Sequence, residues 1–155
     1  MTNAATPYLP DALPVPASDG DGLQAPFWAG LEHEELLIQR CRRCRTWVFA
    51  PEWICHQCHS FDLDWMAVEP TGVIYSWTRV WHPIMPALAE RIPYLAVVVE
   101  LPQAGNVRLI GSLLGDPAKP VKIGARVRGV FERHAAAPGD PTRKAFTLLQ
   151  WMAVA

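Results

Sequence analysis

Residues 41–58 read CRRCRTWVFAPEWICHQC and hold all four cysteines of the chain. They form two Cys-x-x-Cys pairs, Cys41/Cys44 and Cys55/Cys58, with ten residues between the pairs. A Cys-x-x-Cys segment at a hairpin tip turns two thiolates toward one point, and two facing tips supply a tetrahedral cage of sulfurs. Zinc prefers such a cage in closed structural sites. The spacing therefore predicts a structural zinc centre with no open coordination position for catalysis.

The sequence gives weaker support to other roles of the cysteines, such as disulfide formation or redox chemistry. Two disulfides need an oxidising compartment, and residues 1–12 lack the basic and apolar regions of a signal peptide. A redox Cys-x-x-Cys usually occurs once, at the start of a helix. Iron suits the same four-sulfur cage, so the spacing leaves iron open beside zinc. We expect His56 and His59 on the surface, because structural sites close at four ligands.

Composition favours a folded, soluble protein. Of the 155 residues, 50% are hydrophobic and 19% are charged, which suits one domain or two small modules with a common core. No apolar run approaches the ~18 residues of a membrane span, so we expect a cytoplasmic protein. Residues 1–69 have a net charge of −6 and residues 70–155 one of +5. The basic half either faces an anionic ligand or partner or is simply solvated.

Residues 1–23 are expected to form an extended, proline-rich arm, because they have hardly any apolar periodicity with which to build a core. The arm is either a loose terminus or a segment that docks on a partner. Docking would use its apolar side chains, Tyr8, Leu9, Leu13 and Val15.

A helix and a zinc ribbon are predicted for residues 24–64. Residues 24–33 (QAPFWAGLEH) have a proline in a first helical turn and apolar side chains on one side. Short β-prone runs, EELLIQR and TWVFAP, lie on either side of the first cysteine pair and place the metal at the end of a hairpin. Residues 60–64 lead out of the second cysteine pair.

Residues 65–155 are mainly β in pattern. Five strands are predicted there with no helix of useful length between them, at 72–82, 94–102, 107–115, 121–134 (with a turn at Gly124) and 145–154. A Gly-Asn turn at 105–106 joins the second and third strands as a hairpin. A five-stranded OB-fold barrel is the economical arrangement of such a set.

Two features offer contact surfaces. The loop 82–93 is bounded by prolines and contains Ile84, Met85 and Leu88, which are either tucked onto the barrel or offered to a partner or ligand. Several arginines crowd the first cysteine pair and offset the negative charge of a four-thiolate zinc complex. Arg43 and Arg45 are the ones we assign to possible phosphate contact, because guanidinium groups fit phosphate oxygens.

No catalytic motif is evident in the sequence. Nucleophile elbows, phosphate-binding glycine loops and His-Glu-x-x-His are all lacking. Ser112 lies within a strand pattern, His82 precedes a proline at a strand end, and Glu100 and Glu132 are too far apart in sequence to argue as an acid–base pair. We therefore predict no catalytic residues.

The chain resembles a family of small acyl-CoA-associated proteins that join a rubredoxin-like zinc ribbon to an OB-fold, long known as a domain of unknown function. The resemblance runs from about Phe27 to the end and rests on an ordered set of motifs. They are PFWAGL (26–31), CRRC (41–44), PEWICHQC (51–58), TGVIYSWT (71–78), PYLAVVVEL (93–101) and VKIGARVRGVFE (121–132). Many relatives carry a glycine after each cysteine pair, where this chain has Arg45 and His59.

The resemblance implies a non-catalytic accessory subunit of a thiolase-superfamily enzyme, that is, a thiolase, an acyl-CoA condensing synthase or a steroid side-chain aldolase. The partner would carry the catalytic residues, and the small subunit would stabilise it and help shape the passage for acyl-CoA. A heterotetramer with two copies of each subunit is the expected assembly. Candidates for CoA or partner contact are Arg43, Arg45, Arg79, Arg126, Arg128, Ile84, Met85 and Leu88.

Two alternatives belong to other classes. Zinc ribbons and OB-folds also bind single-stranded nucleic acid, and Tyr75, Trp77 and Trp81 would share one face of a regular strand as stacking aromatics. The sequence pI of about 6.5 argues against a phosphate-driven binder. The second alternative is that the chain acts alone, without a partner enzyme, as an acyl-CoA-binding protein.

Overall fold

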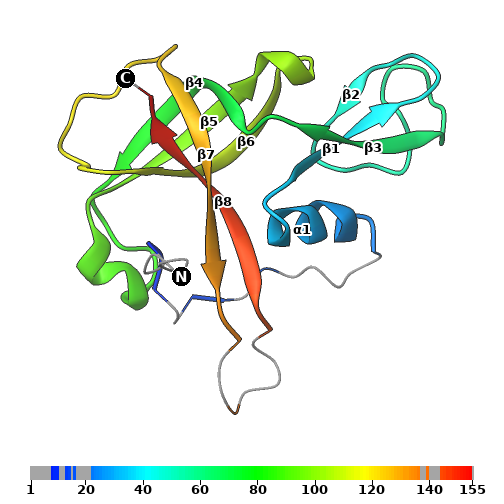
Figure 1. The fold of residues 1–155 in the computed structure, drawn as a ribbon. Helices are drawn as coiled ribbons and strands as arrows, with labels where there is room; N and C mark the ends of the chain where they lie inside the picture. Colours follow the sequence, from blue (N-terminus) through cyan, green and yellow to red (C-terminus); the bar gives the residue numbers. More distant parts are fainter. Residues whose placement is uncertain are drawn as a thin grey trace.

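The computed structural model describes residues 8–10, 13–14, 16, 22–136, 139 and 144–154. It consists of a three-stranded sheet, a closed five-stranded barrel and one short α-helix, α1 (Ala25–Glu32). Figure 1 shows the small sheet on one side of the barrel, with α1 below it. The mainly β class, the short helix, the ribbon and the five-stranded barrel are all confirmed.

The ribbon sheet is formed by β1 (Leu36–Cys41), β2 (Trp47–Val48) and β3 (Leu63–Val68), in the order β2-β1-β3. Both neighbours of β1 are antiparallel to it, and β3 pairs with β1 along six residues, from Leu36↔Val68 to Cys41↔Leu63. Strand β3 was not predicted, because its sequence, LDWMAV, lacks clear alternation. It crosses the predicted domain boundary at residues 64/65, which remains a prediction.

The barrel closes in the order β4-β5-β6-β8-β7. Its strands begin and end within a few residues of the predicted ones: β4 (Thr71–Val80), β5 (Tyr94–Leu101), β6 (Val107–Leu114), β7 (Arg126–His134) and β8 (Phe146–Ala153). The pairs are antiparallel except for β6 with β8, which are parallel at the closure. Asn106 and Gly105 both adopt positive φ, as the predicted turn between β5 and β6 requires.

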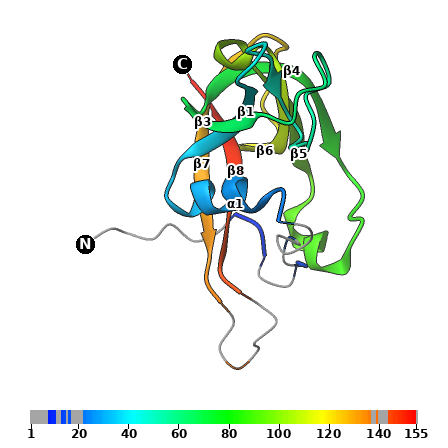
Figure 2. The same ribbon diagram turned by 90° about the vertical axis from the view of Figure 1, so that its right-hand side faces the viewer.

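One apolar core joins the two sheets. The fully buried Trp151 of β8 lies in the same cluster as Leu31 of α1 and Leu36 of β1. Helix α1 packs against both β1 and β8, as Figure 2 shows from the side. The root of the ribbon is thereby anchored to the barrel. Among the described residues, no helix is long and apolar enough to span a membrane.

The loop between β4 and β5 contains a short 3₁₀ helix, η1 (Pro86–Arg91). Leu88 of η1 is 6% exposed, whereas Ile84, just before η1, is 77% exposed. One loop therefore contains both a buried and an exposed apolar side chain, and contact with a partner or ligand stays a prediction.

Candidate functional site

The four cysteines converge at the end of the ribbon. Their Sγ atoms all lie within 4.8 Å of one another, and the Cys41–Cys58 and Cys44–Cys55 separations are each 3.6 Å. A disulfide would need about 2.05 Å. Four sulfurs around a tetrahedral zinc are ~3.8 Å apart, given a Zn–S distance of ~2.3 Å. The cysteines are therefore positioned for a metal ion.

Matching backbone turns present the two cysteine pairs. The Arg45 N–H donates to the Cys41 carbonyl and the His59 N–H donates to the Cys55 carbonyl, both at 2.9 Å. Arg45 and His59 adopt positive φ values of 68° and 56°. The two turns therefore have the same geometry although Arg45 and His59 replace the glycine of many relatives. Both side-chain-bearing residues adopt a backbone conformation that is strained for residues other than glycine.

Neighbouring groups favour the thiolate form of Cys44. Cys44 Sγ lies 3.1 Å from Thr46 Oγ1. Hydrogen bonds from the Thr46 hydroxyl and main chain lower the pKa of the Cys44 thiol to about 6. The buried Gln39 side chain accepts a hydrogen bond from the Glu52 N–H at 2.8 Å, which ties β1 to the segment before the second pair.

The arginines around the first pair have different roles. Arg42 makes a 2.9 Å ion pair with Asp64, and this contact holds the pKa of the Asp64 carboxyl below its ordinary value. Arg40 donates to the Arg45 carbonyl at 3.0 Å and lies over the Trp47 ring. Arg43 and Arg45 are exposed, and within the described part of the chain their side chains make no recorded polar contact. They are the two arginines left available for a ligand.

The predicted contact residues do not gather on one surface. Arg43 and Arg45 are on the ribbon, whereas η1 lies on the opposite side of the barrel from the ribbon in Figure 1. Arg126 and Arg128 are exposed on β7. Arg79 donates to the carbonyls of Pro117 and Lys119, at 2.7 and 3.0 Å, so it holds the β6–β7 loop.

Within loop 82–93, Leu88 is buried within the chain itself, and its assignment to partner contact stays a prediction. Its side chain is 6% exposed. Ile84 stays available at 77% exposure, and Met85 is half-buried. Trp81, at the end of β4, is 68% exposed and adds a second apolar side chain to this surface.

Tyr75, Trp77 and Trp81, which were expected to share one face of a regular strand, do not do so in the structure. The pairing of β4 with β5 shifts by one residue between Ile74 and Ser76, which marks a β-bulge at Tyr75. Trp77 consequently packs against the core while Tyr75 points outward. The Arg108 guanidinium covers the Tyr75 ring at 3.5 Å. The strand therefore lacks the continuous stacking platform that single-strand binding would use.

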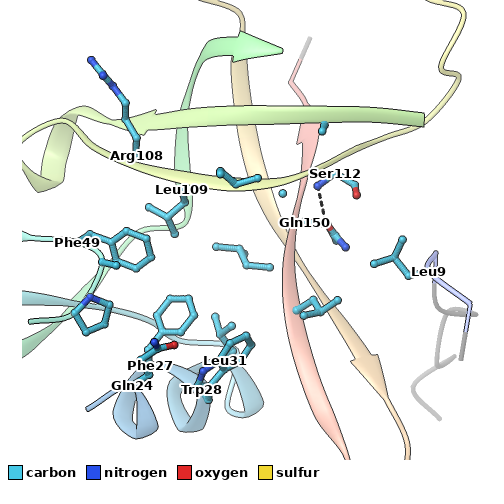
Figure 3. A pocket seen from close by; sticks show the side chains of 17 residues that line it. Leu9, Gln24, Phe27, Trp28, Leu31, Phe49, Arg108, Leu109, Ser112 and Gln150 are labelled. Carbon is cyan, nitrogen blue, oxygen red and sulfur yellow. Dashed lines mark hydrogen bonds between the residues drawn. The ribbon is translucent and has the colours of Figure 1, made fainter. Parts of the chain in front are cut away.

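A groove of about 620 Å³ lies between α1 and the barrel (Figure 3). Its walls are mainly apolar and come from six separate parts of the sequence, including Phe27 and Trp28 of α1, Phe49 after β2, and Leu149 of β8. The sequence reading missed this groove, because no local pattern indicates that these segments meet. Such a cavity has the size and lining of ordinary ligand sites.

A buried polar cluster was missed as well. Glu132 Oε1 lies 3.1 Å from His134 Nε2, and Gln150 Nε2 donates to Glu132 Oε2 at 2.7 Å. All three residues are at most 6% exposed. The alternation of β7 places Glu132 and His134 on the same side of the strand, a signal that was available in the sequence. The cluster is closed off from solvent, so we assign it no catalytic role.

Two family models match the chain and together cover residues 28–132. The ChsH2 rubredoxin-like zinc ribbon domain matches residues 28–64, and the ChsH2 C-terminal OB-fold domain matches residues 65–132. The two matches follow the order of the ribbon and the barrel, and the second match ends before β8.

Individual relatives agree with the family models. A probable enoyl-CoA hydratase alpha subunit of Thermomonospora curvata is 36% identical over 124 residues, which are 79% of this chain and 37% of that protein. The chain thus spans little more than a third of this relative's length. A solved structure described as an Ltp2-ChsH2(DUF35) aldolase aligns with a TM-score of 0.71 and 29% identity, over 90% of this chain and 98% of that one. A DUF35-family protein of unknown function from Sulfolobus solfataricus aligns over 89% and 90% of the two chains, with a TM-score of 0.59; at 13% identity it shows the fold alone.

Proposed function

The chain belongs to the ChsH2 family of paired zinc-ribbon and OB-fold domains, and we propose on this premise that it is a non-catalytic accessory subunit of a thiolase-superfamily aldolase. The observation that carries the proposal is the alignment over nearly the whole of a chain from an Ltp2-ChsH2(DUF35) aldolase. The described residues support it, since they form a scaffold with exposed contact residues and a closed metal centre.

We assign zinc to the four thiolates as a structural ion. Cys41, Cys44, Cys55 and Cys58 would supply all four ligands, and zinc of this kind contributes folding energy rather than a reactive water. The catalytic groups would then belong to the partner, and this subunit would stabilise the partner and shape the acyl-CoA passage.

Chemistry narrows the substrate class. Hydration of an enoyl-CoA places a hydroxyl group on the β-carbon, and an aldolase cleaves the bond between the α- and β-carbons of a β-hydroxyacyl thioester. The names of two relatives, an enoyl-CoA hydratase subunit and an aldolase, are consistent with a hydration product that is also an aldol cleavage substrate. We propose a β-hydroxyacyl-CoA as the substrate of the complex.

Two exposed surfaces suit a partner and an anionic cofactor. Ile84 and Trp81 offer apolar area at the β4 end of the barrel, and Arg126 and Arg128 offer positive charge on β7. The phosphates of CoA are a matched ligand for such arginines. Arg43 and Arg45 provide a second pair of exposed cations on the ribbon.

Affinity purification of the tagged full chain from its native host, with metal analysis of the same sample, tests this function. The expected result is a stoichiometric thiolase-family protein, two copies of each subunit, and one zinc per chain. Recovery of the chain alone, in a form that binds acyl-CoA by itself, would replace the proposal with the stand-alone binding role.

A further inference from the structure

Residues 8–10 of the N-terminal arm lie on the chain's own barrel. The Leu9 N–H donates to Glu132 Oε1 at 2.6 Å, a contact between residues 123 positions apart in the sequence. The arm had been expected to dock, if at all, on a partner. At Leu9 the main-chain donor is instead satisfied within the molecule.

The acceptor at this contact is preformed by the barrel. Both oxygens of Glu132 are engaged, one by Leu9 and the other by Gln150, and His134 lies against the first. The His134 ring is itself held by stacking on Phe146, with ring centroids 4.6 Å apart. A buried carboxylate needs hydrogen-bond donors, and a main-chain N–H supplies one without adding charge.

Tyr8 provides a second point of contact. Its ring lies 6.0 Å from the Arg91 guanidinium at the end of η1. Partial burial raises the pKa of the Tyr8 hydroxyl; Arg91 opposes this shift, while Glu132 and Tyr94 add to it. The arm therefore touches the β4–β5 loop through Tyr8 and strand β7 through Leu9.

The same contact is connected to the groove beside α1. Gln150, which donates to Glu132, also accepts a hydrogen bond from the Ser112 N–H at 2.6 Å. Leu9, Ser112 and Gln150 all line the groove, and Figure 3 shows Leu9 at the end opposite Arg108. An arm docked at Glu132 thus completes one wall of this groove.

We propose that Glu132, His134 and Gln150 form a docking site for an extended peptide segment, and that its resident ligand is the chain's own arm. The segment suits the site because Pro7 and Pro10 flank Tyr8 and Leu9 in the sequence, so less conformational freedom is lost on docking. The docked arm straps η1 to β7 and closes the end of the groove. This inference is independent of the proposed partner enzyme.

The first test is the exchange rate of the Leu9 amide proton, measured by NMR on the full chain. Glu132→Gln removes the negative charge, so the Leu9 N–H loses its charged acceptor whichever oxygen is replaced by the NH₂ group. We expect exchange at Leu9 to become about tenfold faster or more, from the usual strength of a hydrogen bond to a charged group. The matched charge change Glu100→Gln, at an ion pair with Arg108, is expected to leave the rate unchanged.

A second pair of variants leaves the barrel untouched. Leu9→Pro removes the donor, whereas Leu9→Ala keeps it and shortens only the side chain. We expect the ¹H–¹⁵N NOE of the Tyr8 amide to fall to the value of a flexible chain in Leu9→Pro and to stay near wild type in Leu9→Ala. Equal values in both variants, or an unprotected Leu9 amide in the wild-type chain, would overturn the docking site. Protection of Leu9 that increases with protein concentration would instead assign the arm to a second copy and overturn the resident-ligand claim.

Discussion

In the ribbon, β2 pairs with β1 at two positions, whereas in the barrel β7 pairs with β8 at eight. The ribbon also leaves large side chains in solvent, with Phe61 at 77% and Trp53 at 58% exposure, whereas Trp151 fills the barrel at 0%. The root of the ribbon shares the apolar core, but its outer end has short pairing and exposed aromatic side chains, so we expect that end to depend on a bound metal. The barrel is expected to depend on its strand pairing and core. We therefore expect the outer end of the ribbon and the barrel to be stabilised by different physical means, so that each can be weakened separately.

Loss of the metal is expected to have the largest effect. Structural zinc contributes on the order of 10 kcal/mol in zinc-finger peptides, so chelation or Cys55→Ser should unfold the ribbon. Hydrogen exchange should show lost protection in β1–β3 and retained protection in β5 and β6. His56→Ala, next to a ligand, serves as the control and should keep one zinc per chain. Simultaneous loss of protection in both sheets would show that the shared core makes them one cooperative unit.

Removal of the Trp151 side chain should have the opposite effect, destabilising the barrel while the ribbon keeps its metal. Trp151→Ala is expected to lower the free energy of unfolding by about 3–5 kcal/mol, because it empties the middle of the core. Denaturant unfolding gives this value, and metal analysis should still find zinc in the ribbon. Trp81→Ala, at a 68% exposed position, should change stability by only about 0.5 kcal/mol. A similar loss in both variants would contradict the assigned core.

The turns after the cysteine pairs allow a smaller, stabilising change. Arg45→Gly and His59→Gly should each raise stability by up to about 1 kcal/mol, since glycine relieves positive φ but adds freedom to the unfolded chain. The midpoint of zinc release against a competing chelator measures this effect on the ribbon. Arg43→Gly, where φ is not positive, should be destabilising.

The smallest effect concerns the exposed ion pair of the ribbon. Because Arg42 lowers the pKa of Asp64, the pair stabilises the fold at pH values above the ordinary carboxyl pKa of 3.8. This contribution disappears as the pH falls through the lowered pKa of the folded state. Asp64→Asn should therefore be slightly less stable than wild type at neutral pH and equal to it in acid. Thermal unfolding at several pH values checks this, and a difference that grows in acid would contradict it.

Prediction from the sequence was most successful where the signal is local. The spacing of Cys41 to Cys58 indicated the metal centre, and alternation with turn residues located all five barrel strands. Prediction was least successful at β3, which pairs in the ribbon with β1, 22 to 32 residues earlier in the chain. It also failed at Tyr75, where a β-bulge places Tyr75 and Trp77 on different faces of β4. Neither pairing partner nor bulge is encoded in the periodicity of one segment.

The sequence by itself determined the four cysteines of the metal centre, the order of ribbon and barrel, and the five barrel strands, because cysteine spacing and side-chain alternation act over a few residues. Only the tertiary structure decided that Leu88 is buried, that Arg79 holds a loop, and that Leu9 meets Glu132. It also decided where the groove beside α1 lies. These outcomes depend on which distant segments the closed barrel brings together, and the free energy of such contacts is a property of the assembled chain.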